Sequence, residues 1–599
     1  MGSSNSRRSR TMSTSSETET EVLGAQGGSD YPSARAAEYP SPRGIDCPPP
    51  RGAGGSDCPA PSRGANSSTR TGVEEDQHDL QAILAYLIRR SVFSGQVRIV
   101  TQHEEGDDEG EYSDDYEFCS SASKPPRPDD DPDTSRIDVN DIKNQILGDS
   151  GRLQKNGIMK KKPTTLVGLL QNREIGRRGN QQFTCSDRRA ISCQYLPNSR
   201  TVIDNYYHKA FCGTYSKEGN IFLTAAQDPN LRIYNTENGN FDKFKTIRAR
   251  DVGWSVLDTA FSPDGLYMAY SSWSDCIHLC NIYGEEDTHK SLHLFPGDHS
   301  FSIFSLAFSS DNREILGGAN DGCLYIYDRH EDKRTLKIDA HEDDVNAVTF
   351  ADDSSHILFS GGDDGLCKVW DRRTLRDDNP LPVGVLAGHC DGITYIDPKG
   401  DARYLLSNSK DQTMKLWDIR MFSSQCAISN TKKAVSKQRW DYRWQQVPRK
   451  VQAKKTLEGD TSVMTYRGHS ILHTLIRCHF SPQYTTGQRY AYTGCATGAV
   501  VIYDLLTGEI VTKLTGHKQC VRDVSWHPYE NTLVSTSWDG MVGKWEYMPE
   551  EDSEDEYSDT SDSDESPSED NDLPPRRSRR LADKDRRQVE HFQRQALFD

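Results

Sequence analysis

Short runs in which apolar and polar residues alternate recur through the second half of the chain. Four clear examples close on an aromatic residue and an acid: Asp321-GCLYI-Tyr327-Asp328, Asp364-GLCKV-Trp370-Asp371, Asp411-QTMKL-Trp417-Asp418 and Asp539-GMVGK-Trp545-Glu546. A period of two, in segments rich in β-branched and aromatic residues, is typical of β-strands. An apolar strand such as Val345-NAVTF and a polar turn such as Ser309-SDN lie upstream. The pattern predicts an all-β domain built from repeated strands.

Weaker copies extend the series to seven repeats. They are Asp228-PNLRI-Tyr234-Asn235, Ser274-DCIHL-Cys280-Asn281 and Thr497-GAVVI-Tyr503-Asp504. The closing positions 234, 280, 327, 370, 417, 503 and 545 are 42–47 residues apart, except for one interval of 86. This is the WD-repeat pattern, in which single four-stranded sheets bury their faces by stacking around an axis. We predict a seven-bladed WD-repeat β-propeller at about residues 185–548.

Two details of the ring follow from the repeat spacing. The last repeat ends at Trp545-Glu546, so its outermost strand must come from before Phe211, and Arg189-AISCQYLP is the candidate. The long interval places an insertion at about 421–465, which is basic and contains Trp440-Asp-Tyr-Arg-Trp444. We expect this insertion to project from the rim or a face, where repeat proteins usually carry function.

The repeated His, Ser/Thr and Asp residues suggest acyl-transfer chemistry, but their repetition argues against it. A catalytic triad occurs once, whereas Asp364, Asp411 and Asp539 recur at one offset. We interpret them as a buried hydrogen-bond network that holds each turn to its strands. The sequence has no nucleotide-binding, hydrolase or zinc-protease motif, so we expect no enzyme activity and no cofactor. Most cysteines lie in strand-like runs without metal-ligand spacing, and we predict no metal site.

An amphipathic helix is predicted ahead of the propeller, within residues 73–100. Thr71-Gly-Val-Glu74 fits a capping box. Behind it, five apolar residues share one stripe: Leu80, Ile83, Leu84, Leu87 and Ile88. The stripe needs a surface on which to be buried, either the flank of the propeller or a groove on a partner. Residues 101–184 are expected to form an acidic, mostly disordered linker with short helices.

The net charge of −18 is concentrated in two places. Residues 104–117 carry nine acids and no base, and residues 550–572 carry thirteen, interleaved with seven Ser/Thr. The rest of the chain is slightly positive, about +4, so no direct nucleic-acid binding is expected. The tails at 1–72 and 549–599 should be disordered, and the second should be open to phosphorylation.

Targeting signals point to the nucleus and the cytoplasm. Residues 1–20 lack the apolar segment of a secretory signal, and no apolar run has the length of a membrane helix. Arg576-Arg-Ser-Arg-Arg580 is similar to a nuclear import signal. Gly2 fits the N-myristoylation pattern weakly, so membrane attachment is not expected.

An arginine two residues after the Trp-Asp pair occurs in two consecutive repeats. These are Trp370-Asp371-Arg372-Arg373 and Trp417-Asp418-Ile419-Arg420. The pair resembles the WDxR motif of the DCAF-type WD-repeat substrate receptors of cullin-RING E3 ubiquitin ligases. Wider text is also similar, including Ala249-RDVGWSVLD, Tyr270-SSWSDCIHLCNIYGE and Leu84-AYLIRR. The WDxR string at Trp440–Arg443 lacks the upstream strand pattern, and we treat it as a chance match.

The resemblance implies a substrate receptor. Arg373 and Arg420 would contact the ligase's large three-propeller adaptor, named for damaged-DNA binding, and the Leu80–Ile88 stripe would enter a cleft of that adaptor. A cullin would join through the adaptor, and protein substrates would be presented for ubiquitination and proteasomal degradation. The substrate-binding residues are not readable from the chain. Two alternatives stay open: a stand-alone peptide-binding scaffold of the chromatin or signalling type, and an RNA-associated assembly factor.

Overall fold

The computed structural model describes residues 132–152, 165–175, 182–284, 288–297, 300–448, 451 and 456–549. The predicted helix at 73–100 and both predicted tails lie outside these residues. The described strands form seven four-stranded antiparallel sheets, which we number blades 1 to 7. None of the described helices is long and apolar enough to cross a membrane.

The strands of each blade are as follows. Blade 1 has β2 (Ala210–Tyr215), β3 (Ile221–Ala226), β4 (Asn230–Asn235) and β5 (Asp242–Arg248); blade 2 has β6 (Asp258–Phe261), β7 (Tyr267–Ser271), β8 (Cys276–Asn281) and β9 (His289–His293); blade 3 has β10 (Ile303–Phe308), β11 (Glu314–Ala319), β12 (Cys323–Asp328) and β13 (Lys333–Asp339). Blade 4 has β14 (Val345–Phe350), β15 (Ile357–Gly362), β16 (Cys367–Asp371) and β17 (Gly384–Leu386); blade 5 has β18 (Ile393–Pro398), β19 (Tyr404–Ser409), β20 (Thr413–Asp418) and β21 (Met464–Tyr466). Blade 6 has β22 (Cys478–Phe480), β23 (Tyr490–Gly494), β24 (Ala499–Asp504) and β25 (Ile510–Thr515); blade 7 has β26 (Val521–Trp526), β27 (Leu533–Ser537), β28 (Met541–Glu546) and β1 (Ser199–Asn205).

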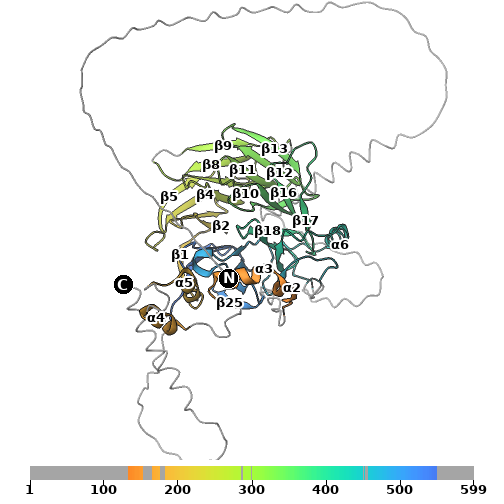
Figure 1. Cartoon of the computed structure of the whole chain (residues 1–599). Coiled ribbons are helices and arrows are strands. Elements are labelled where there is room, and N and C mark those ends of the chain that lie inside the picture. The colour runs from red at the N-terminus through yellow and green to blue at the C-terminus, as the bar shows by residue number, and fades with distance from the viewer. Residues whose placement is uncertain are drawn as a thin grey trace, which may run out of the picture. The chain divides into compact units, whose positions relative to one another are not determined.

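The blades stand around an axis in chain order, so the seven-bladed propeller is confirmed (Figure 1). The first strand of each blade neighbours the first strand of the next, and β26 returns to β2. Every closing position of the seven repeats lies in a third strand. The tryptophans there, Trp370, Trp417 and Trp545, are fully buried between blades. Stacking therefore buries the apolar residues that the period-two pattern puts on both faces of each sheet.

The ring closes with a strand from before Phe211, as predicted, but not with the predicted segment. The closing strand is β1, which pairs with β28 from Ser199 opposite Glu546 to Asn205 opposite Met541. Residues 189–192 of the predicted strand instead belong to helix α5 (Cys185–Ser192). The Thr184 side chain and Asp187 form a reciprocal capping box that starts this helix. The helical start signal overrides the short apolar run.

The ring has two faces, which the ladder order defines. The arginine face carries the turns between first and second strands and between third and fourth strands, including Arg373 and Arg420. The histidine face carries the turns between second and third strands and the connections between blades, including His341, His389 and His517. These names are used for the two faces below.

Helices in the stretch before β1 pack onto the propeller. They are α2 (Ser135–Val139), α3 (Asp141–Asp149) and α5, and the same stretch also holds α4 (Leu166–Glu174). Ile137, Ile142 and Ile146 are buried in one cluster with residues of blades 5 and 6. Arg403 and Asp504, on the arginine face, form ion pairs with Asp141 and Arg152. Part of the predicted linker at 101–184 is therefore built into the core, which the sequence analysis missed.

The insertion leaves blade 5 after β20 and returns at β21. Its helix α6 (Gln425–Val435) lies against the outer edge of blade 4, beside the short strand β17 (Figure 1). Ser423 bonds the main chain of Val385 and Ala387, so it covers the exposed edge of β17. Further along, Tyr442 and Arg443 reach the histidine face, where their carbonyls meet His473. The insertion thus follows the rim from one face to the other.

Candidate functional site

Three copies of a histidine, serine, aspartate and tryptophan network lie inside blades 4, 5 and 7. In blade 5, His389 Nδ1 lies 3.0 Å from Asp411 Oδ2, and His389 Nε2 lies 2.7 Å from Ser407 Oγ. Trp417 Nε1 donates to the same hydroxyl oxygen at 2.7 Å. The corresponding sets are His341, Asp364, Ser360 and Trp370, and His517, Asp539, Ser535 and Trp545.

These networks are structural. Ser407 is fully buried and its oxygen accepts the indole N–H, so it has no access to a substrate. Burial lowers the pKa of His341 against the opposing pull of Asp364, which keeps the imidazole neutral. Each network ties a blade connection to a third strand, as the sequence analysis interpreted it.

The two candidate docking arginines lie in adjacent blades, 4 and 5, on the arginine face. Each guanidinium folds back onto the aspartate two residues earlier. Arg373 Nε and Nη2 donate to Asp371 at 2.9 and 2.7 Å, and Arg420 Nη2 donates to Asp418 at 3.0 Å. The hydrogen bonds from Arg373 lower the pKa of Asp371 to about 2. The two arginine side chains nevertheless remain 62% and 56% exposed, so each keeps donors available to a partner.

The aspartate–arginine fork is a local motif and does not require a Trp-Asp strand end. Arg443 makes the same fork on Asp441, with Nε and Nη2 donating at 2.9 and 2.8 Å. This pair lies in the insertion, next to the histidine face. Arg443 therefore has the same local conformation as Arg373 and Arg420, and it differs from them only in its position on the ring.

Around Arg420, the N-terminal helices supply residues that the sequence analysis missed. Asp141 of α3 lies 3.3 Å from Arg420 Nη2 and 2.9 Å from Arg403 Nη2. Asn140 donates to Asp418 at 3.2 Å and accepts from Tyr404 at 2.5 Å. Asn140 also caps α3, and this N-cap residue ahead of a stripe at 142 and 146 was the available signal.

Exposed apolar side chains lie in the segments next to these arginines. They are Val139 of α2, Leu381 and Val383 in the turn that follows Arg373, and Met421 and Phe422 directly after Arg420. A cavity of about 260 Å³ lies between α2 and the end of β20, with Val139, Asp141, Arg420 and Met421 in its wall. Apolar side chains beside exposed guanidinium groups are the composition expected of a protein interface. The predicted helix residues Leu80, Ile83, Leu84, Leu87 and Ile88 lie outside the described residues.

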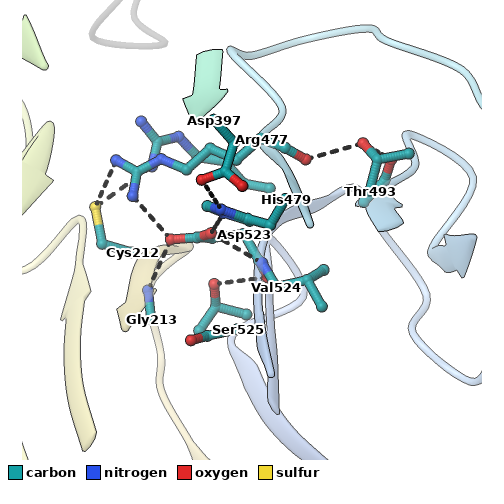
Figure 2. Close-up of polar contacts among 12 residues, drawn as sticks. Cys212, Gly213, Asp397, Arg477, His479, Thr493, Asp523, Val524 and Ser525 are labelled. Carbon is teal, nitrogen blue, oxygen red and sulfur yellow. Dashed lines mark hydrogen bonds and ion pairs between the residues drawn. The ribbon is translucent and has the colours of Figure 1, made fainter. Parts of the chain in front are cut away.

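A second polar centre fills the channel of the ring (Figure 2). Arg477, which is almost fully buried, places Nη2 2.5 Å from Asp258 and Nη1 3.0 Å from Asp523. Asp523 also accepts the main-chain N–H of Gly213 at 3.1 Å. These residues come from blades 1, 2, 6 and 7, so the network joins inner strands around the axis. Each buried charge has a partner, as burial requires.

His479 extends the network toward blade 5. Its Nδ1 lies 3.2 Å from Asp397, and its Nε2 lies 3.7 Å from Asp523 (Figure 2). Burial alone would lower the pKa of His479, but the carboxylates of Asp397 and Asp523 raise it to about 9. Above these groups a cavity of about 380 Å³ opens on the arginine face, with Lys217 and Asp353 at its mouth. The charged residues Arg477 and His479, in and just before β22, were the only sequence signal for this centre.

The histidine face is rich in aromatic side chains. Trp254 and Trp538 pack against Phe211 at the inner end of blade 1, with ring centroids 5.3 and 5.8 Å apart. Trp273 and Trp444 are exposed. Tryptophan supplies large contact area and is enriched at the energetic centres of protein interfaces. This face therefore offers a second contact surface, on the opposite side of the ring from Arg373 and Arg420.

Seven four-stranded sheets around an axis, each with a strand that ends on an aromatic–acid pair or a weaker copy of it, define a WD-repeat propeller protein. The family model described as "WD domain, G-beta repeat" matches residues 289–328, 332–371, 381–418 and 508–546. A Caenorhabditis elegans protein named "DDB1- and CUL4-associated factor 11 homolog" is 41% identical over 63% of this chain and 68% of its own. The chain belongs to the same family as this Caenorhabditis elegans protein. This confirms the resemblance to the DCAF-type family that was seen in the sequence.

Two further relatives agree. The Caenorhabditis briggsae homologue of the same name is 40% identical over 62% of this chain and 70% of its own. The "LEC14B protein" of Lithospermum erythrorhizon is 42% identical over 64% of this chain and 83% of its own.

Proposed function

We propose that this chain is the substrate-recognition subunit of a cullin-RING E3 ubiquitin ligase. The arginine face docks on a DDB1-type adaptor, and the histidine face, with the neighbouring part of the insertion, holds a protein substrate. The name of the two Caenorhabditis relatives associates those proteins with DDB1 and CUL4. The observation that carries the proposal is the pair of exposed guanidinium groups in adjacent blades, with exposed Val139 and Met421 in the wall of the cavity that Arg420 also lines.

Docking through these arginines needs little rearrangement. The forks hold Arg373 and Arg420 in place before binding, so less side-chain entropy is lost on contact. Each charge-assisted hydrogen bond to the adaptor would contribute about 1.5–3 kcal/mol. Ubiquitin transfer itself is performed by other subunits, and the receptor accelerates it by holding the substrate near them.

The test is an affinity purification from cells in which the proteasome or neddylation is blocked. Wild-type chain should bring down the adaptor and the cullin, and the double variant Arg373→Ala/Arg420→Ala should not. Arg443→Ala is the matched control, because it removes the same local fork on the other side of the ring. Thermal melting of all three chains tests the fold. Equal recovery of the adaptor by wild type and double variant would refute the proposal, and so would an equal loss in Arg443→Ala.

Two parts of the proposal extend to residues outside the structure. The Leu80–Ile88 stripe would enter a cleft of the adaptor. Deleting this segment of the chain should therefore also weaken adaptor binding. The basic segment at 576–580 would carry the chain into the nucleus, so a fluorescent fusion lacking it should shift toward the cytoplasm.

A second candidate function is supported by the central cavity. A stand-alone peptide reader would bind a peptide at the channel mouth, where Tyr395 lines a cavity of about 380 Å³ with charged groups at its base. That function predicts that no cullin is recovered with wild-type chain. It also predicts that Arg373→Ala/Arg420→Ala changes none of the recovered partners.

A further inference from the structure

Three side chains with metal-ligating atoms converge on the histidine face at the outer end of blade 2. Asp275 lies in the turn before β8, Cys276 is the first residue of β8, and His293 is the last residue of β9. One ligand atom from each lies within 4.8 Å of the others. Cys276 Sγ is 2.9 Å from His293 Nδ1 and 3.2 Å from Asp275 Oδ1. Among the residues that the structure describes, no second group of this kind occurs.

The strand ladder builds this arrangement. Cys276 and His293 are directly paired in the β8–β9 register, so their side chains share one face of the sheet. The main-chain N–H of Leu294 donates to the carbonyl of Asp275 at 3.0 Å, which ties the turn to the neighbouring strand. The His293 ring stacks on Phe295, with centroids 5.7 Å apart. The three groups are therefore held by rigid elements before any ligand binds.

The donor set fits one metal best. Thiolate, imidazole and carboxylate together are typical zinc ligands, with bonds of about 2.3, 2.0 and 2.1 Å. Around a tetrahedral centre with such bonds, neighbouring ligand atoms are about 3.6 Å apart. The observed separations of 2.9 and 3.2 Å would have to open by well under 1 Å once the thiol proton leaves. Rotation of exposed Asp275 and His293 side chains can supply that movement.

We propose that Asp275, Cys276 and His293 bind a zinc ion with one open coordination position. The fourth position faces solvent on the histidine face and is filled by water, or by a histidine, cysteine or carboxylate of a protein bound there. This site departs from the prediction of no metal site that was made from the sequence. It does not depend on the docking of the arginine face.

Cobalt is the probe, because a thiolate bound to Co²⁺ gives a charge-transfer absorption that carboxylates and imidazoles do not. The full chain is stripped of metal with a chelator, titrated with Co²⁺ and then back-titrated with Zn²⁺. We expect a saturable band at one equivalent, which zinc abolishes. Cys276→Ser should remove the band, and His293→Ala should weaken binding by at least about tenfold, since even loss of an outer-shell partner costs 10–100-fold.

Cys280→Ser is the matched control, since Cys280 is a buried cysteine of the same strand and is not one of the three ligands. It should leave the band and the affinity unchanged. Absence of a thiolate band in wild-type chain would overturn the proposal. Equal binding by wild type and Cys276→Ser would overturn it too, because the metal would then sit elsewhere. Melting curves without metal establish that each variant is folded.

Discussion

Replacing Arg477 by methionine should destabilise the propeller strongly. Methionine keeps much of the apolar stem but removes the charge that pairs with Asp258 and Asp523. Both carboxylates are at most 5% exposed. Removing one partner of a buried ion pair leaves an uncompensated charge and costs about 3–5 kcal/mol. Asp523 retains the N–H of Gly213, and Asp258 retains the N–H of Leu306 at 2.7 Å, so we expect the lower half of this range.

Urea unfolding followed by tryptophan fluorescence measures this loss. A second chain, Arg477→Met/Asp258→Asn/Asp523→Asn, removes the charges that Arg477→Met leaves unpaired. It should recover part of the lost free energy, because a neutral replacement of a buried ion pair is often tolerated. A loss of less than about 1 kcal/mol in Arg477→Met would show that water or backbone solvates these carboxylates. The channel network would then not be what joins blades 2, 6 and 7.

Three further predictions concern stability. Ile146→Ala should lower the free energy of unfolding in urea by about 2–5 kcal/mol, because Ile146 is fully buried in the core of blades 5 and 6. Val139→Ala is the control at an exposed position and should lower it by less than about 0.5 kcal/mol. His479 has a pKa of about 9 in the folded chain, above the ordinary 6.5, so its contribution is complete below pH 6.5 and is lost as pH rises through 9. Unfolding free energies at pH 6.5 and 10 should differ by up to about 3 kcal/mol from this group, and His479→Phe should flatten that difference. Asp411→Asn should cost about 3 kcal/mol by thermal or urea unfolding, since it leaves His389 without its carboxylate in a buried network; an unchanged midpoint would contradict the structural role of these networks.

The architecture was predictable because it is repeated. Period-two strands that end on an aromatic–acid pair at intervals of 42–47 residues define the sheet number and the chain order. One misassigned strand cannot overturn seven concordant repeats. Ring closure by an N-terminal strand was also predictable, because β28 would otherwise leave an unpaired edge.

The segment that closes the ring was not predictable from apolar residues alone. Arg189-AISCQYLP reads as a short strand, but Thr184 and Asp187 begin a helix just before it. The strand that does close the ring, Ser199–Asn205, is mostly half-exposed and polar. Its place follows from pairing with β28, which is a tertiary contact. Local pattern therefore favoured the wrong segment.

The channel network was beyond sequence reasoning for a related reason. Arg477 and Asp258 are 219 residues apart, and they meet only because the inner strands of seven blades converge on one axis. A charged residue in a strand is visible in the sequence, but its partner is not. The same holds for Asp141, which reaches Arg420 from a segment that was expected to be a linker.

The two neighbouring arginines of blade 4 show where a motif stops being informative. Arg372 donates through Nε to Glu314 of blade 3 at 2.8 Å, so it holds two blades together. Arg373, one residue on, contacts only the aspartate of its own motif among the ion pairs described and remains largely exposed. Arg443 forms the same fork as Arg373, but it lies in the insertion and not at the end of a blade strand. A docking role therefore cannot be derived from the WDxR motif alone. It depends on which face of the ring the strand ending presents, and on whether an adjacent blade presents a second arginine beside apolar side chains.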